Sequence, residues 1–284
     1  MKITNKHNLP QALVDAIKND PYTRGVSDIS VTQLISPVKK VSLERKHVHE
    51  LEEDASGRIW SLIGQAVHTI LERANSKDLV ERRFYLDVLG KRISGQIDAL
   101  LTDGNLIDYK VTSAWQVKSG VKDEWEKQLN ICRYLIEHSG SYLSIARLSV
   151  VAILRDWSKL EAQRSEDYPQ SQVVMLPVKM WTSEETRKYI EERVTLHFSD
   201  TLPDCNSVER WQRPSVWAVM KQDQKKAVKL FYSPEDADQF LLTNPKLFVV
   251  KREGMSIRCK FYCSALSFCS QGQSLTKGDS NEIS

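Results

Sequence analysis

Apolar and polar residues alternate between residues 92 and 111, which predicts two paired strands. In the first strand an apolar face opposes a polar one, with Ile93, Ile97, Ala99 and Leu101 on one side and Ser94, Gln96 and Asp98 on the other. Asp103-Gly104 is a strong hairpin signal before the second strand. Alternate side chains share a face there, so Asp108 and Lys110 point the same way. If the strands pair, Asp98 and Asp108 converge, and their carboxylates repel each other unless a hard cation such as Mg²⁺ lies between them.

The rest of the chain shows the periodicities of further helices and strands. Helical spacing of apolar residues predicts helices over 8–19, 58–74, 121–138 and 182–198, with Thr182 as a cap, and a short helix that starts at Ser233-Pro234. Extended runs cover 29–35, 80–89 and 146–154. The order helix, three strands, helix, strand predicts the α/β fold class, with a mixed central β-sheet flanked by helices. Beyond Gln271 the chain is polar, and we expect disorder there.

The predicted helix 58–74 is amphipathic. Its apolar stripe, the expected core-facing side, holds Trp60, Ile63, Val67, Ile70, Leu71 and Ala74. The opposite side carries Ser61, Gly64, Gln65, His68 and Glu72. His68 is therefore expected to point away from the local core. Such a histidine is either a metal ligand or a surface or hydrogen-bonded structural residue.

Four short motifs follow one another in the chain, namely Gly64-Gln65-Ala66-Val67-His68-Thr69-Ile70-Leu71-Glu72, Ile97-Asp98, Asp108-Tyr109-Lys110 and Gln128-Leu129. This series resembles the PD-(D/E)XK nuclease superfamily, in its RecB-like exonuclease branch, and stand-alone proteins of this layout resemble phage-encoded nucleases. The resemblance implies a restriction-endonuclease-like αβββαβ core at 58–200. It also implies an N-terminal helical extension at 1–57, a C-terminal extension with cysteines at 201–270 and a disordered tail at 271–284.

The resemblance also implies roles for individual residues. One or two Mg²⁺ or Mn²⁺ ions would be held by Asp98 and Asp108, with His68, Glu81 and the Tyr109 carbonyl as further ligands. Glu81 has the alternative of capping or pairing beside Arg82 and Arg83. Lys110 would orient the attacking water or neutralise charge on the phosphate. Gln128 matches the helix that guides the DNA strand, although Cys132 stands where that motif has tyrosine. Gly64 would let its helix approach the sheet closely.

The implied activity is metal-dependent DNA hydrolysis, as an exonuclease in recombination, repair or replication. The net charge of +3 is only mildly basic, and cations for DNA flank the motifs at Lys39, Lys40, Arg45, Lys46, Lys91, Arg92, Lys118 and Lys122. The chain shows no nucleotide-binding loop, so it would act alone or with a separate helicase or recombination protein. Two alternatives are a catalytically silent DNA-binding scaffold and a metal-dependent phosphoesterase for another substrate. The retained charged residues disfavour the first, and the lack of paired histidine and aspartate motifs disfavours the second.

Five cysteines, an odd number, argue against a disulfide framework. Cys259, Cys263 and Cys269 are separated by three and five residues. Some RecB-like nucleases bind an iron–sulfur cluster through a similar C-terminal trio, and here the fourth ligand would be Cys132 or Cys205. Zinc is a second possibility, and a cysteine-rich segment packed against the core is a third.

The sequence has no run of ~20 apolar residues long enough to cross a bilayer. The beginning, Met-Lys-Ile-Thr-Asn-Lys, lacks the apolar segment of a secretion signal. We therefore expect a cytoplasmic protein without a membrane partner.

Overall fold

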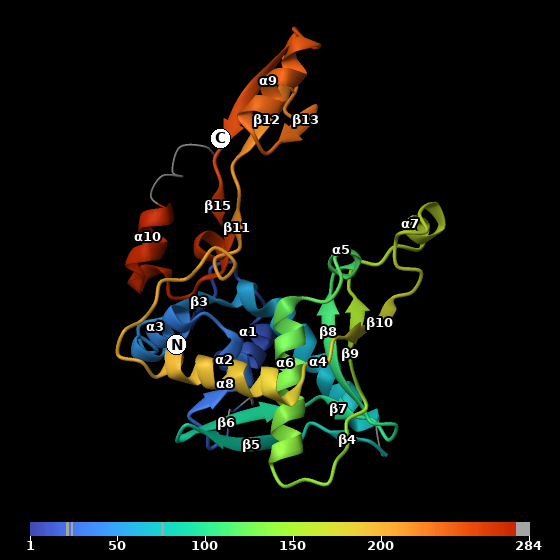
Figure 1. Ribbon diagram of the computed structural model, residues 1–284, viewed down its shortest axis with the longest axis vertical. Helices are drawn as coiled ribbons and strands as arrows, with labels where there is room; N and C mark the ends of the chain where they lie inside the picture. Colours follow the sequence, from blue (N-terminus) through green and yellow to red (C-terminus); the bar gives the residue numbers. More distant parts are fainter. Residues whose placement is uncertain (21–22, 24, 75–76, 277–284) are drawn as a thin grey trace. The chain divides into compact units, whose positions relative to one another are not determined.

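The computed structural model describes residues 1–20, 23, 25–74 and 77–276, and the chain divides into two compact units (Figure 1). Unit 1 comprises Met1–Val38 and Glu52–Leu202, and unit 2 comprises Lys39–Leu51 and Pro203–Ser284. Both units combine helices with strands, so the predicted α/β class is confirmed. Within the described residues, no helix combines the length and apolarity that crossing a bilayer requires.

Unit 1 holds the predicted motifs. Its helices are α1 (Gln11–Lys18), α2 (Val31–Ile35), the 3-10 helix η1 (Ala55–Arg58), α4 (Ile59–Ala74), α5 (Ala114–Lys118), α6 (Asp123–His138), α7 (Lys159–Arg164) and α8 (Ser183–His197). Its strands are β1 (Lys2–Thr4), β2 (Ile29–Ser30), β3 (Glu52–Asp54), β4 (Leu79–Val80), β5 (Arg83–Val88), β6 (Lys91–Gln96), β7 (Ala99–Leu100), β8 (Asn105–Thr112), β9 (Arg147–Leu154) and β10 (Val173–Val178).

The strands of unit 1 form two main sheets. A five-stranded sheet has the order β10-β9-β8-β7-β4, in which β8 and β9 are parallel and the other pairs antiparallel. A three-stranded sheet has the order β2-β6-β5, with β2 parallel to β6. The Asp103-Gly104 turn connects β7 to β8 as predicted, with Gly104 in the left-handed region at φ +78°. The sheet is therefore mixed, as expected.

The two sheets are joined by one bent hairpin. Val80 pairs with Ala99 in the larger sheet, and Arg83 pairs with Gln96 in the smaller one, in the same register. Between these pairs, the Glu81 N–H donates to the Asp98 carbonyl at 3.1 Å, and Glu81 has a left-handed backbone at φ +48°. The expected continuous strand over 92–101 is therefore wrong at residues 97–98, because the chain crosses there from one sheet to the other.

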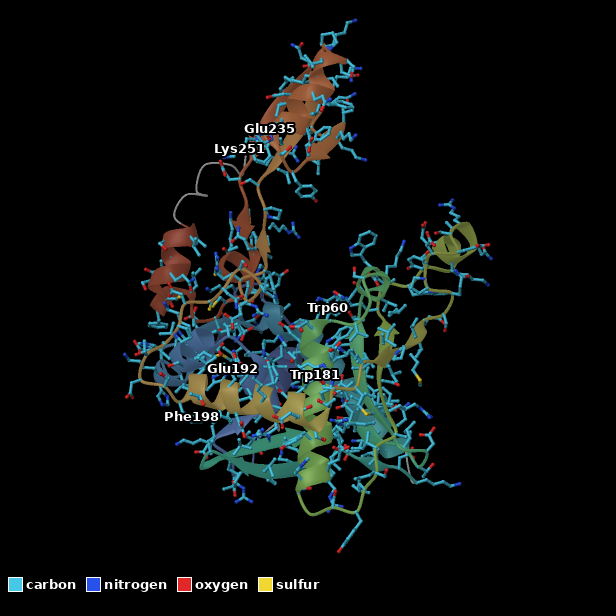
Figure 2. The ribbon with its side chains drawn as sticks, viewed as in Figure 1. Trp60, Trp181, Glu192, Phe198, Glu235 and Lys251 are labelled. Carbon is cyan, nitrogen blue, oxygen red and sulfur yellow. The ribbon has the colours of Figure 1, made fainter. Side chains whose placement is uncertain are left out.

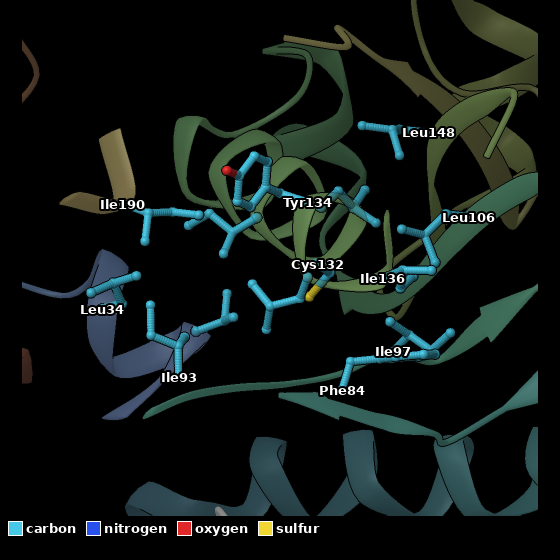
Figure 3. Packing of buried hydrophobic residues seen from close by; sticks show 14 of the residues in the cluster. Leu34, Phe84, Ile93, Ile97, Leu106, Cys132, Tyr134, Ile136, Leu148 and Ile190 are labelled. Atoms are coloured by element: carbon cyan, nitrogen blue, oxygen red, sulfur yellow. The ribbon is translucent and has the colours of Figure 1, made fainter. Parts of the chain in front are cut away.

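A large apolar core lies between these sheets and the helices (Figure 3). Helix α6 contributes Ile131, Leu135 and Ile136, all fully buried. They pack with residues of α2, the two sheets and α8, including Leu34, Ile93, Leu106, Leu148, Ile190 and Val194. Burial of apolar area of this extent is the main stabilising term for the unit.

The strand predicted over 29–35 is only partly correct. Only Ile29 and Ser30 are in a strand, and α2 starts at Val31. The Ser30 side chain accepts from the Gln33 N–H at 3.3 Å, and the Gln33 side chain accepts from the Ser30 N–H at 3.4 Å. This reciprocal capping box outweighs the strand preference of the β-branched residues.

Two later helices begin directly after the capping residues predicted from the sequence, Thr182 and Ser233. Thr182 and Glu185 form a capping box at the start of α8, and Ser233 caps α9 (Pro234–Leu242) with proline at its first position. The expected disorder beyond Gln271 is wrong for residues 272–276, which belong to α10 (Ser270–Thr276). Residues 277–284 of that expected tail lie outside the described residues.

Unit 2 is built from two distant stretches of chain. Its other elements are α3 (Val38–Lys46), β11 (Gln212–Arg213), β12 (Val216–Lys221), β13 (Lys229–Phe231), β14 (Leu247–Arg252), β15 (Met255–Ser256), the π-helix η2 (Arg258–Tyr262) and the 3-10 helix η3 (Leu266–Phe268). An antiparallel sheet of order β13-β12-β14 carries α9 on one face, where the Phe231 and Phe240 rings lie 5.5 Å apart.

Gly95 gives a test of this packing. A Cβ atom there would lie 3.0 Å from Val31 Cγ2, 3.2 Å from Cys132 Sγ and 3.3 Å from Leu135 Cδ2. We expect Gly95→Ala to lower the free energy of unfolding by about 1–3 kcal/mol, because the core must expand to admit the methyl group. Urea denaturation followed by circular dichroism measures this change.

Gly64→Ala is the matched control. A Cβ atom at Gly64 would meet nothing within 4 Å, so the expectation that this glycine permits close approach to the sheet is wrong. Alanine should leave the stability unchanged or raise it by up to about 1 kcal/mol through helix propensity. Equal losses in the two variants would contradict the packing argument.

Candidate metal centre

Helix α4 turns its polar side toward β8. His68 Nε2 lies 3.2 Å from the Tyr109 carbonyl oxygen, and the two rings meet edge to face at 6.2 Å. The expected burial of the apolar stripe is wrong, since Trp60 is 54% exposed and Ile70 is 64% exposed. The reason is that α4 contacts β8, η1 and α1 and buries no residue fully. His68 does point away from the apolar stripe, but toward the strand that carries Asp108 and Lys110.

Three potential ligands converge at the bend of the hairpin. His68 Nδ1 lies 3.4 Å from Asp98 Oδ1 and 3.5 Å from Glu81 Oε1, and one ligand atom from each residue lies within 4.8 Å of the others. The cause is local, because Glu81 and Asp98 are opposite each other in the hairpin register. One imidazole nitrogen and two carboxylates form a donor set that suits a divalent cation.

One oxygen of each carboxylate, of Asp98 and of Glu81, is fixed by a hydrogen bond. Asp98 Oδ2 accepts a hydrogen bond from the Tyr109 N–H at 2.6 Å, which leaves Oδ1 directed at His68. Glu81 Oε2 accepts from the Gln96 amide at 2.5 Å, which leaves Oε1 for His68. Each carboxylate therefore presents one oxygen to the same small volume. Glu81 is engaged with His68 and Gln96, rather than in the ion pair with Arg82 or Arg83 considered from the sequence.

His68 compensates the charge of these carboxylates. Its hydrogen bonds to Asp98 and then Glu81 raise its pKa to about 10, against the effect of its burial. The imidazole is therefore protonated at neutral pH. A divalent cation would replace that proton, because it neutralises the same two carboxylates and requires a neutral imidazole nitrogen.

Asp108, Lys110 and Gln128 form a second cluster. Lys110 Nζ donates to Asp108 Oδ1 at 3.0 Å and lies 2.7 Å from Oδ2. Gln128, on α6, donates to Asp108 Oδ1 at 3.0 Å and accepts from Lys110 Nζ at 3.4 Å. The shared strand face predicted for Asp108 and Lys110 thus results in direct contact. Gln128 fixes both charged groups from the side of the core.

Asp108 occupies a buried position. Its burial raises its pKa to about 6, Lys110 acts in the opposite direction, and Asp98 adds to the increase. Among the described residues Oδ2 receives no properly directed hydrogen bond, although the ammonium of Lys110 is close. A buried carboxylate oxygen without a donor fits a cation ligand. The structure nevertheless leaves Asp108 outside the His68, Glu81 and Asp98 group, as its neighbour.

Lys110 stays charged in this setting. Burial acts to lower its pKa, but Asp108 and Asp98 outweigh that effect and hold the pKa above its usual value. A cavity of about 940 Å³ opens onto Lys110, Gln128 and the three potential ligands, with walls from α4, β6, β8 and α6. That volume accommodates a ligand of nucleotide size. The candidate centre therefore combines anionic ligands with the fixed ammonium of Lys110.

The cysteines fall into two groups. Cys132 is buried in α6 of unit 1, where burial and the nearby Asp108 and Asp98 raise its pKa to about 12. The other four, Cys205, Cys259, Cys263 and Cys269, belong to unit 2, and all five are free thiols. Burial, Glu209 and the three other thiols raise the pKa of Cys205 to about 11.

Backbone contacts hold part of the cysteine group. Cys205 exchanges two hydrogen bonds with the Gln271 side chain, at 2.9 Å and 2.8 Å. Cys269, two residues earlier in the chain, accepts from the Gly272 N–H at 3.3 Å through its sulfur. These contacts tie Cys205 to the segment that follows Cys269, but among the described residues no three cysteine sulfurs lie within 4.8 Å of one another.

Some functional groups have no signal in the sequence motifs. Gln96 and the Tyr109 N–H orient the carboxylates, and Trp60, with the Arg155 guanidinium over its ring, lines the cavity. The alternation predicted over 92–101 puts Gln96 on the polar face with Asp98, and it is the one sequence pattern that bears on Gln96.

No protein-family model and no curated protein sequence matches this chain. Among solved structures, the protein SSO0001 is similar at a TM-score of 0.45 and 17% identity, with 66% of this chain and 85% of that chain covered. A protein of Eubacterium rectale, provisionally named an exonuclease, is similar at a TM-score of 0.31 and 10% identity, with 52% and 58% covered. Likeness at this level bears on neither the fold nor the activity of this chain.

Cation binding at the three ligands is directly testable. We expect Mn²⁺ at about a hundred times its Kd to stabilise the protein by about 2.7 kcal/mol, which raises Tm by several degrees. Asp98→Asn should abolish this increase, because it removes a charged ligand, whereas Asp87→Asn on an exposed part of β5 should keep it. Differential scanning calorimetry measures the shifts, and equal increases in all three proteins would place the cation elsewhere.

Proposed function

We propose that this protein is a metal-dependent DNA nuclease that hydrolyses phosphodiester bonds, acting as an exonuclease in DNA recombination, repair or replication. The observation that carries this proposal is one cavity that combines the His68, Glu81 and Asp98 ligand group with Lys110 and Gln128. The ligand group suits a divalent cation, and Lys110 supplies a positive charge beside it. A phosphodiester needs both during hydrolysis.

In this proposal, each residue of the candidate metal centre has a separate role in hydrolysis. His68, Glu81 and Asp98 would hold Mg²⁺ or Mn²⁺, with Asp108 and the Tyr109 carbonyl beside them. When bound, the ion would polarise a phosphoryl oxygen and lower the pKa of a water molecule. Lys110 would orient the attacking water or neutralise charge that develops on the phosphate.

Asp108 and Gln128 would act on Lys110. Asp108 lies 2.7 Å from the ammonium, and Gln128 accepts a hydrogen bond from it at 3.4 Å. Two contacts restrict a flexible side chain that otherwise samples many rotamers, so the ammonium is positioned before substrate arrives. Gln128 is accordingly proposed as a positioning residue, rather than as a guide for the DNA strand.

DNA cleavage tests the proposal. We expect Mg²⁺ or Mn²⁺ to support loss of end-labelled linear DNA but not of closed circular DNA. Lys110→Ala should reduce the rate by about 10²- to 10³-fold, the usual effect of removing one group that stabilises transition-state charge. Asp98→Asn should remove metal-dependent cleavage. Lys188→Ala, at an exposed position of α8, is the matched control and should keep the wild-type rate.

The same experiment separates the alternatives. A folded wild type that binds DNA but cleaves neither substrate with either metal would favour the silent scaffold. Consumption of a nucleotide monophosphate ester, but not of DNA, would favour a phosphoesterase. Cleavage of closed circles would assign an endonuclease. Cleavage that survives in Lys110→Ala would contradict the role given to that residue.

We also propose that unit 2 holds a thiolate metal centre, either an iron–sulfur cluster or a zinc ion, on Cys205, Cys259, Cys263 and Cys269. The support is that all four are free thiols of one unit, with Cys205 tied by Gln271 to the segment that follows Cys269. No three of these described sulfurs lie within 4.8 Å of one another, so the metal would have to draw them together. Thiolates bind both kinds of centre.

Reconstitution distinguishes the two centres from a metal-free segment. The protein is supplied under anaerobic conditions with iron and sulfide in one arm and with zinc in the other, and retained metal is measured after gel filtration. We expect Cys205→Ser to lose most of the metal that the wild type retains, because a ligand is removed. Cys132→Ser is the control and should retain it. A wild type that keeps no metal in either arm would assign the cysteines to packing alone.

A further inference from the structure

Trp60 is an exposed aromatic residue beside the candidate metal centre. Trp60 is at the N-terminal end of α4 (Figure 2) and is 54% exposed. It lines the same cavity as His68 and Lys110. The Arg155 guanidinium lies 4.2 Å from the centre of its ring. A tryptophan that serves packing alone is normally far more buried. This residue therefore has surface available for a ligand.

Arg155 is held in place by the sheet. It directly follows β9, and its N–H donates to the Thr112 carbonyl at the end of β8 at 2.9 Å. The next residue, Asp156, accepts from the Ala114 N–H at 2.7 Å and so fixes the start of α5. Arg155 is thus connected by short, direct contacts to the strand that carries Lys110. The backbone of Arg155 therefore has a fixed position relative to the candidate centre.

Further cationic and aromatic groups extend from this pair. Trp115 on α5 is 74% exposed, with the Lys118 ammonium 5.7 Å from its ring centre. Burial lowers the pKa of Lys122, and the positive charges of Arg155 and Lys110 lower it further. Cations that alternate with exposed aromatic rings are typical of surfaces that bind single-stranded nucleic acid.

We propose that Trp60, stacked on Arg155, is a base-stacking element that holds an unpaired nucleotide and thereby selects single-stranded DNA ends for the metal centre. This proposal rests on the proposed nuclease function for its catalytic consequence, although the binding itself does not. Unpaired bases expose both faces to a ring, whereas a base inside a duplex is covered by its neighbours. Eight residues of helix separate Trp60 from His68, about 12 Å, so the stacked base would lie a few nucleotides from the bond at the centre.

The binding test uses Asp98→Asn as the background, so that bound DNA stays intact. Fluorescence anisotropy measures the affinity of this protein for a labelled dT oligonucleotide and for a blunt duplex of the same length. Adding Trp60→Ala should weaken binding to the oligonucleotide by about 5- to 150-fold, the usual effect of removing one base–aromatic stack. Binding to the blunt duplex should change less than about twofold.

Two further variants keep the test specific. Trp60→Phe retains an aromatic face and should preserve most of the affinity, which separates stacking from a folding defect. Tyr142→Ala removes a fully exposed aromatic residue from the loop before β9 and should change neither affinity. An equal loss for both DNA forms in Trp60→Ala, or no loss for either, would overturn the proposal.

Cleavage by the otherwise wild-type protein then separates this proposal from the nuclease function. If the protein binds the oligonucleotide through Trp60 but cleaves no DNA, the stacking role of Trp60 is supported and the nuclease function is rejected. If the wild type and Trp60→Ala cleave DNA with the same preference for unpaired ends, the nuclease function is supported and the stacking role of Trp60 is rejected.

Discussion

The electrostatic repulsion between Glu81 and Asp98 is the constraint on which the candidate centre depends. The hairpin register sets these residues opposite each other where the chain leaves one sheet and enters the other. The left-handed backbone of Glu81 is an uncommon conformation that the surrounding strands enforce. A positive charge must lie between two such carboxylates, and the protonated His68 supplies it.

The hydrophobic core and the candidate centre share one helix. Helix α6 buries Ile131 and Leu135 among the sheets and places Gln128 one turn earlier, against Asp108 and Lys110. Asp108 is costly to bury, and its contacts with Lys110 and Gln128 offset part of that cost. Precise packing around α6 therefore also fixes the geometry of the ammonium. A site supported in this way is more exactly positioned than one built on loops.

The sequence predicted elements whose signals are local. Period-two alternation placed Asp108 and Lys110 side by side, and the caps Thr182 and Ser233 marked helix starts correctly. It could not predict the break at residues 97–98, because alternation continues unchanged while the strand moves to another sheet.

Tertiary contacts decided the remaining differences. The apolar stripe of α4 was expected in the core, but the attraction of His68 to the two carboxylates turns the polar side of the helix inward. The Trp60 and Arg155 pair joins residues from α4 and the end of β9, which no local pattern connects. Contacts across such a distance in the sequence depend on the completed fold.

The discontinuity of unit 2 has a consequence for how the protein is made. Residues 39–51 belong to this unit through contacts with its distant part, where Lys39 pairs with Asp204 at 2.5 Å and the His47 ring stacks on Phe268 at 4.0 Å. On the ribosome, this early segment emerges long before its partners are synthesised. Unit 2 can be completed only after the whole second stretch of unit 1 has been synthesised, so its first segment stays without its partners throughout that time.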